Sequence, residues 1–346
     1  MSQKRMALLG DAFIDINLSG LVRLPSYGID VPCQGVKMTV GGSCANTARQ
    51  LASLGRQKIS ATFFSSVGDD ELGALFRRSL REENLLENPD TSLHILSGVP
   101  QSCCTILAGP SDRAMISCYA SNEKIAITPF RDALLAGEFN CLHIGGYFNC
   151  IGCHTSEFLD VIDALKANGT LISMDPQHDA NEKWTGEDGH LKQLLPKLDV
   201  FMPNEVEIVR TADVNLPRAS SDSPRTPEEA LEALAAEYPT LLIVLTLGVK
   251  GLRAARGPTE RWMNLAEPDV KFVDATGAGD ACAAGFLSYY VTKPAAQDER
   301  TEWLWVNRAL KAGTIAGACC VERAGACEKP ITVEEFNEMR DREGEI

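Results

Sequence analysis

Apolar residues along this chain form short strand-like runs that alternate with longer runs at helical spacing. Residues 43–55 and 71–83 carry small and apolar side chains at the helical period, and Gly55 is a natural stop for the first of them. Strand-like runs cover residues 6–9, 63–68, 141–145, 171–175, 200–204 and 241–246. Strands separated by helices in this order predict a mostly parallel central sheet with helices on both faces.

Other stretches depart from this alternation. Residues 92–121 alternate short β-prone pieces with turns such as 109–112, which predicts a separate small sheet. Residues 218–227 are rich in Ser, Pro and charge and are typical of a surface insertion, and residues 340–346 form a charged end. We therefore expect one large α/β domain with an appended small sheet.

Composition narrows the classes of function. The 346 residues carry a formal net charge of −14, which argues against a broad nucleic-acid surface. No run approaches the roughly 18 apolar residues of a membrane span, and the first residues lack a secretory pattern. The 12 cysteines are more typical of reduced thiols than of a disulfide framework. We expect a cytoplasmic protein with a small-molecule partner, without nucleic acid or membrane.

The most informative segment is residues 274–280, Asp-Ala-Thr-Gly-Ala-Gly-Asp, between a strand-like run and a helix-like run. A glycine-rich helix start offers unpaired N–H groups to an anion. A carboxylate at Asp280 would repel a bound phosphate, and this cost is explained if Asp280 takes a proton from an attacking hydroxyl. A dinucleotide fingerprint would need glycine where Cys282 stands, and the Walker Gly-Lys-Ser/Thr tripeptide is absent. A simple turn with a capping Asp is the alternative.

In open parallel sheets, ligands bind beyond the carboxyl ends of the strands. Several polar or glycine positions fall there on this interpretation: Asp15, 41–42, 68–69, Asp175, Asn204, 246–248 and 274–280. Their shared placement predicts one binding site at that edge of the sheet.

Two motifs in this order resemble the signatures of the ribokinase-like (PfkB) family of carbohydrate kinases. They are residues 41–48, Gly-Gly-Ser-Cys-Ala-Asn-Thr-Ala, and residues 274–280. Further landmarks match in order at 10–15, 68–70, 175–176, 203–207, 246–251 and 323–326. The resemblance spans roughly residues 6–335. It implies a ribokinase-like fold for residues 6–338, with lid segments at about 13–40 and 92–121, followed by a charged tail at 339–346.

The resemblance also implies roles for individual residues. Asp280 would be the catalytic base, and Gly277, Ala278 and Gly279 would form a backbone anion hole. Asp15, Gly41, Gly42 and Asn46 would bind the acceptor. Thr246, Gly248, Gly251 and Thr314 would flank the nucleotide, and Asn204 and Glu207 would order Mg²⁺ through water. Taken alone, an ordinary helix cap is the alternative interpretation of Asn204–Glu207.

The resemblance implies an ATP- and Mg²⁺-dependent kinase that phosphorylates a primary hydroxyl of a monosaccharide or sugar acid. A nucleoside is the alternative acceptor, because Phe13 or Tyr147 could stack on a base. A non-catalytic scaffold is the alternative from another class. Three positions depart from the family pattern: Ala275, Phe13 and Lys329. Lys329 stands where many members place a serine near a monovalent cation, so an ammonium could replace potassium. The lid often pairs with a second copy, which would give a homodimer.

Overall fold

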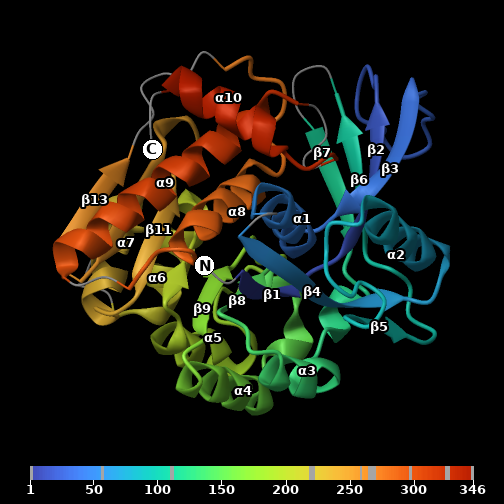
Figure 1. The fold of residues 1–346 in the computed structure, drawn as a ribbon. Coiled ribbons are helices and arrows are strands. Elements are labelled where there is room, and N and C mark those ends of the chain that lie inside the picture. Colours follow the sequence, from blue (N-terminus) through green and yellow to red (C-terminus); the bar gives the residue numbers. More distant parts are fainter. Residues whose placement is uncertain are drawn as a thin grey trace.

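The computed structural model describes residues 3–55, 58–109, 113–217, 223–257, 259–263, 270–295, 298–323 and 328–343 (Figure 1). Residues 110–112, 218–222, 324–326 and 344–346, which belong to patterns discussed above, lie outside this part.

The main sheet is mostly parallel, as predicted. Its nine strands in the described part of the chain follow the order β13-β12-β11-β10-β9-β8-β1-β4-β5. Seven neighbours are parallel: β11 (Leu242–Thr246), β10 (Val200–Phe201), β9 (Leu171–Asp175), β8 (Cys141–Gly145), β1 (Lys4–Gly10), β4 (Ile59–Gly68) and β5 (Leu93–Leu96). The strands β12 (Leu252–Arg256) and β13 (Thr259–Met263) extend the sheet in antiparallel pairing.

Helices cover both faces because alternate strand residues point to opposite sides. On one face, Met6 and Leu8 of β1 belong to a core with α1 (Ser43–Gly55), α2 (Glu71–Glu83), α8 (Ala278–Tyr290) and α9 (Glu299–Val321). On the other, Ala7 and Leu9 pack with α3 (Arg131–Ala136), α4 (Ser156–Ala167), α5 (His190–Leu194), α6 (Glu205–Asn215) and α7 (Pro227–Glu237). This two-sided burial explains why the central strands are apolar throughout.

A separate small sheet has the order β3-β2-β6-β7 and stands to one side of the main body (Figure 1). It consists of β2 (Phe13–Ser19), β3 (Gly35–Gly41), β6 (Cys103–Ala108) and β7 (Arg113–Cys118). We call it the lid. One part of the expectation is wrong: the sequence pattern places residues 93–96 in this small sheet, but as β5 they pair with β4 in the main sheet.

The chain's last described element is α10 (Val333–Glu343), which continues across residue 339 as a helix. Within the described ranges, no helix combines the length and apolar character needed to pass through a bilayer.

Candidate active site

The predicted site residues gather where the parallel strands end and two helices begin. Gly10 of β1 and Gly145 of β8 are paired at this edge, and a Cβ added to Gly10 would lie 1.9 Å from the Gly145 carbonyl oxygen. Because no side chain fits there, the N-terminus of α1 can approach the strand ends closely. The first turn of α8 packs against α1, so the two sequence motifs meet although more than two hundred residues separate them.

Asp280 lies in the first turn of α8 and is buried. Its Oδ1 accepts a hydrogen bond from Ser43 Oγ at 2.8 Å, and its Oδ2 accepts one from Asn46 Nδ2 at 2.9 Å. Thr47 Oγ1 donates to the Asp280 backbone carbonyl at 3.3 Å. Ser43 and Asn46, three residues apart at the start of α1, therefore fix the orientation of this carboxyl group, and Thr47 holds the backbone behind it.

Burial raises the pKa of Asp280 to about 7, while the hydrogen bonds from Asn46 and Ser43 lower it, and the nearby charges of Asp11 and Asp15 raise it further. A carboxyl group that titrates near neutrality suits proton transfer at physiological pH. This environment gives Asp280 the character of a general base.

We expect the pH dependence of kcat/KM to report this group. Because the base acts as a carboxylate and its pKa is raised to about 7, activity should fall as the pH drops below about 7 and level off above it. Ser43→Ala removes a hydrogen bond that favours the carboxylate, so it should move the falling limb to higher pH. Initial rates between pH 5.5 and 9 measure both effects.

The matched control for this measurement is Ser53→Ala, on the same helix, whose hydroxyl donates to the Ile331 carbonyl instead. That variant should leave the limb in place. A profile that is flat through pH 6–8, or one that Ser43→Ala leaves unmoved, would remove Asp280 as the group being titrated.

The predicted anion cradle is the tight turn that leads into α8. Gly277 caps the helix with φ of +73°, a conformation that favours glycine. A Cβ at Gly279 would meet no heavy atom of the described residues within 4 Å, so the first turn is open on that side. The Ala278 N–H donates to the Ala275 carbonyl at 3.2 Å, so it would have to release that bond to hold a phosphate oxygen.

The acceptor side is built by the base of the lid and the start of α1. Asp15 on β2 faces Gly41 on β3, where a Cβ would lie 2.3 Å from the Asp15 carboxyl group. Gly42 has φ of +99°, and its carbonyl accepts the first hydrogen bond of α1 from the Asn46 N–H at 2.8 Å. Glycine at 41 and 42 thus leaves room for Asp15 and for the turn into α1.

Asn46 connects this acceptor side with the base. Its Nδ2 donates to Asp280, but its buried Oδ1 has no hydrogen-bond partner among the described residues. A buried acceptor without a donor is costly, so the site is suited to a ligand that brings a hydroxyl group. Burial and the nearby Asp11 raise the pKa of Asp15 to about 6, whereas Arg49 lowers it.

Asn204 and Glu207 form a complete capping box at the start of α6. Asn204 Oδ1 accepts from the Glu207 N–H at 3.0 Å, and Glu207 Oε2 accepts from the Asn204 N–H at 2.9 Å. Burial raises the pKa of Glu207 to about 7, and Asp280 raises it further. The pKa of Asp175, at the end of β9, is raised strongly by burial and by the charge of Glu207.

These buried carboxyl groups fit a divalent cation held through water. Within the described residues, no three His, Cys, Asp or Glu side chains are placed to cage a metal directly. Mg²⁺ usually keeps several waters and takes few protein carboxylates in phosphate-binding sites. A cation near Asp175 and Glu207 would also relieve the repulsion that raises both pKa values.

The expected nucleotide residues lie around the loop after β11. Thr246 ends β11, and its N–H donates to the Pro203 carbonyl at 2.9 Å. Gly248 and Gly251 have φ of +55° and +87° in the turn that follows. Thr314 lies on α9, and the adjacent Gly313 approaches Leu252 at the start of β12. The Thr314 hydroxyl donates to the Leu310 carbonyl at 2.8 Å, within its own helix.

Sequence analysis missed three contacts of this site. Ser43 binds the carboxyl group of Asp280, and Asp11 accepts a hydrogen bond from the Cys44 N–H at 2.8 Å at the start of α1. Arg113 of the lid donates to Asp274 Oδ1 at 2.8 Å and so joins the lid to the cradle. Asp11 and Ser43 could have been found from the sequence, because both lie within the quoted motifs, whereas Arg113 lies in none of them.

The two aromatic residues considered for base stacking are not exposed. Tyr147 is fully buried, and its hydroxyl contacts His190 Nδ1 at 2.8 Å. Phe13 is 6% exposed and packs edge-on against Tyr119, with ring centroids 5.5 Å apart. Tyr147 therefore belongs to the core in this structure, which removes one of the two arguments for a nucleoside.

A parallel sheet, a lid and a carboxyl group at a glycine-rich helix start define a phosphotransferase. The model of the pfkB family of carbohydrate kinases matches residues 3–332, so this chain belongs to that family. It is 28% identical over 267 residues to the ATP-dependent 6-phosphofructokinase of Thermoanaerobacterium thermosaccharolyticum, 76% of each chain. It is 25% identical over 271 residues to the adenosine kinase of Schizophyllum commune, 74% of each chain.

Comparison with solved structures agrees with this family. A ribokinase-like protein of Escherichia coli, solved with ATP and Mg²⁺, has a TM-score of 0.76 and 20% identity, covering 98% of this chain and 99% of that one. The ribokinase-like fold predicted from the motifs is thus confirmed. This chain is a carbohydrate or nucleoside kinase of the pfkB family, an enzyme that transfers phosphate to an alcohol group.

Proposed function

We propose that this enzyme transfers the γ-phosphoryl group of ATP to a primary hydroxyl of a monosaccharide or sugar acid. The observation that carries this proposal is the side chain of Asn46, which binds Asp280 through Nδ2 and leaves its buried Oδ1 for a hydroxyl. A polyol brings neighbouring hydroxyl groups that can donate to Asn46 Oδ1 and to Asp15.

Asp280 would accept the proton of the attacking hydroxyl as that hydroxyl's oxygen displaces ADP. The first turn of α8, with Gly277, Ala278 and Gly279, would place N–H groups against the charge of the transferred phosphoryl group. Ser43 and Asn46 hold the carboxyl group of Asp280 in place before substrate arrives. Positioning and charge stabilisation supply most of the catalysis in phosphoryl transfer.

ATP would lie between the loop at Thr246, Gly248 and Gly251 and the helix residue Thr314. Mg²⁺, which neutralises phosphate charge in such reactions, would be held through water by Glu207 and Asn204 with Asp175 nearby. The ATP and Mg²⁺ bound by the Escherichia coli protein support this assignment. A metal would also offset the strongly acidic character of the site.

A panel of acceptors tests the proposal: ribose, fructose, 2-keto-3-deoxygluconate, adenosine and cytidine, with ADP release as the readout. We expect acceptor-dependent ADP release with a sugar or sugar acid. A preference for adenosine or cytidine would favour the nucleoside alternative, which the adenosine kinase relative keeps open. ATP binding without turnover on any acceptor would favour a scaffold.

Potassium should stimulate the enzyme only weakly. Lys329 is exposed at a position where related kinases place a serine near a monovalent cation, and its ammonium group could take the place of that cation. The measurement is a titration of potassium chloride against a sodium chloride background at constant ionic strength. Removing the ammonium group by Lys329→Ser should increase the stimulation by potassium. Strong stimulation of the wild-type enzyme would contradict the prediction.

The lid offers a surface for a second copy of this chain. Met38 and Ile116 are 49% and 66% exposed and align across the sheet through Ile16 and Thr105. These residues lie on the face opposite to Asp15, because neighbouring strand residues alternate. We expect a homodimer by sedimentation velocity, which Met38→Glu with Ile116→Glu should dissociate. Leu304→Glu on α9, also exposed, is the control; a monomeric wild type would contradict the prediction.

A further inference from the structure

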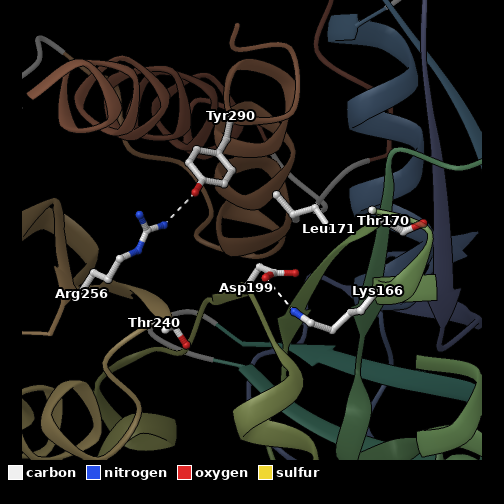
Figure 2. Close-up of a pocket in the computed structure, with 8 residues that line it drawn as sticks. Lys166, Thr170, Leu171, Asp199, Thr240, Arg256 and Tyr290 are labelled. Carbon is white, nitrogen blue, oxygen red and sulfur yellow. Dashed lines mark hydrogen bonds and ion pairs between the residues drawn. The ribbon is translucent and has the colours of Figure 1, made fainter. Parts of the chain in front are cut away.

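A cavity of about 320 Å³ lies where β9 begins, at the end of that strand away from the candidate active site. Figure 2 shows residues that line it. It is lined by residues of four neighbouring elements and their connections: Lys166, Gly169, Thr170, Leu171, Asp199, Thr240, Arg256 and Tyr290. Leu171 begins β9, whose last residue, Asp175, belongs to the acidic cluster of the active site. Four residues along a strand span about 13 Å, so the two sites are separate.

The cavity carries an excess of positive charge in a chain of net charge −14. Lys166 Nζ pairs with Asp199 Oδ1 at 2.8 Å, but its side chain is 33% exposed and its ammonium group has three N–H donors, so donors remain for a ligand. Arg256 and the adjacent Lys293 share one carboxylate, that of Glu302. Glu302 and Lys293 lie outside the lining, so the charged lining residues are Lys166, Arg256 and Asp199, which leaves about one positive charge for a ligand.

Arg256 is the incompletely paired member of this group. Its Nη2 donates to the neutral Tyr290 hydroxyl at 2.8 Å, as Figure 2 shows, and its Nη1 lies 3.4 Å from Glu302 Oε1. That separation is longer than the roughly 2.7–2.9 Å of a strong charge-assisted hydrogen bond. Its buried Nε has no acceptor among the described residues. An arginine with spare donors in a cavity wall is suited to phosphate or carboxylate oxygens.

Hydroxyl groups complete the lining. The Tyr290 hydroxyl accepts from Arg256 and donates to Glu302 at 3.1 Å, so toward a ligand it can act only as an acceptor, and Thr240 is exposed (Figure 2). The volume is at the small end of the range for small-molecule sites, roughly 300–1,000 Å³. The cavity therefore fits a compact organic anion with hydroxyl groups better than a nucleotide.

We propose that this cavity is a second binding site, specific for a small hydroxylated organic phosphate, with Arg256 and Lys166 as the anion-binding residues. Its walls are the far ends of active-site elements. Tyr290 ends α8, which begins next to Gly277, and Arg256 ends β12, which begins after Gly251. A ligand here would contact the same helix that carries Asp280 at a distance of about 15 Å along its axis.

The probe is 3-phosphoglycerate, which has no primary hydroxyl for the enzyme to phosphorylate. Isothermal titration into the wild-type protein should give saturable binding. Arg256→Gln should raise the dissociation constant about tenfold or more, because it removes the charged donor. Lys166→Gln should also raise the dissociation constant, and Lys197→Gln, its matched control, should not. Lys197 also pairs with a carboxylate, Asp163 at 2.6 Å, but lies outside the cavity lining.

A second pair of variants avoids any effect on folding. Thr240 is exposed, so Thr240→Asp should be tolerated and should weaken binding by repulsion, whereas Thr240→Asn should not. Absence of saturable binding to the wild type would overturn the proposal. Equal dissociation constants in the wild type, Arg256→Gln and Thr240→Asp would also overturn it and would place the probe in the active-site cradle instead. None of these outcomes depends on the acceptor of the kinase reaction.

Discussion

Asp280→Asn is expected to lower kcat by about 10²–10⁴-fold while the protein keeps its fold and its affinity for ATP. At 1.36 kcal/mol per tenfold, this loss corresponds to about 3–5 kcal/mol of transition-state stabilisation. An amide of nearly the same shape can still occupy the pocket of Ser43 and Asn46, but it cannot take a proton. Acceptor-dependent ADP release measures kcat, and a fluorescent ATP analogue measures nucleotide affinity.

The control for this variant separates the base from its supports. Asn46→Ala removes one hydrogen bond to Asp280 and the unpaired Oδ1, so it should raise the acceptor KM and lower kcat less than Asp280→Asn does. An Asp280→Asn enzyme that kept more than about a tenth of wild-type turnover would show that another group accepts the proton.

Elements bounded by clear turn chemistry could be predicted closely from the sequence. The strand at 141–145 and the helix at 71–83 have the predicted bounds, and Asp70 caps that helix by accepting from the Gly73 N–H at 2.9 Å. Apolar runs between glycine and aspartate leave little freedom in where such elements begin and end.

Contacts between distant segments could not be predicted in the same way. The four residues of β5 have no pattern that distinguishes the edge of the main sheet from the lid, so their pairing with β4 depends on tertiary packing. The hydrogen bond from Ser43 to Asp280 joins residues that are 237 positions apart, and no sequence spacing predicts it. The family motifs located the site, whereas its internal hydrogen bonds required the structure.

The second large effect is expected at Asp15, where replacement should impair recognition of the acceptor rather than chemistry. Asp15→Asn should lower kcat/KM for the acceptor by about 10²-fold, since a carboxylate makes charge-assisted hydrogen bonds of about 1.5–3 kcal/mol each. The KM for ATP should change little, because Asp15 lies on the lid, away from the loop of Thr246 and Gly248. Steady-state kinetics with each substrate varied in turn measure both values.

The same change should not destabilise the enzyme. Burial and the charge of Asp11 raise the pKa of Asp15 to about 6, so its ionised form weakens the folded state progressively as pH rises from the ordinary aspartate range through about 6. A neutral amide removes this cost above pH 7, and the melting temperature of Asp15→Asn should equal or exceed that of the wild type. Asp30→Asn, at an exposed position between β2 and β3, should change neither property. Unchanged kcat/KM in Asp15→Asn would place the acceptor elsewhere, and a lower melting temperature would mean that Asp15 is structural. A loss of acceptor recognition together with a gain of stability would instead show that this carboxylate is kept for binding, at the expense of the fold.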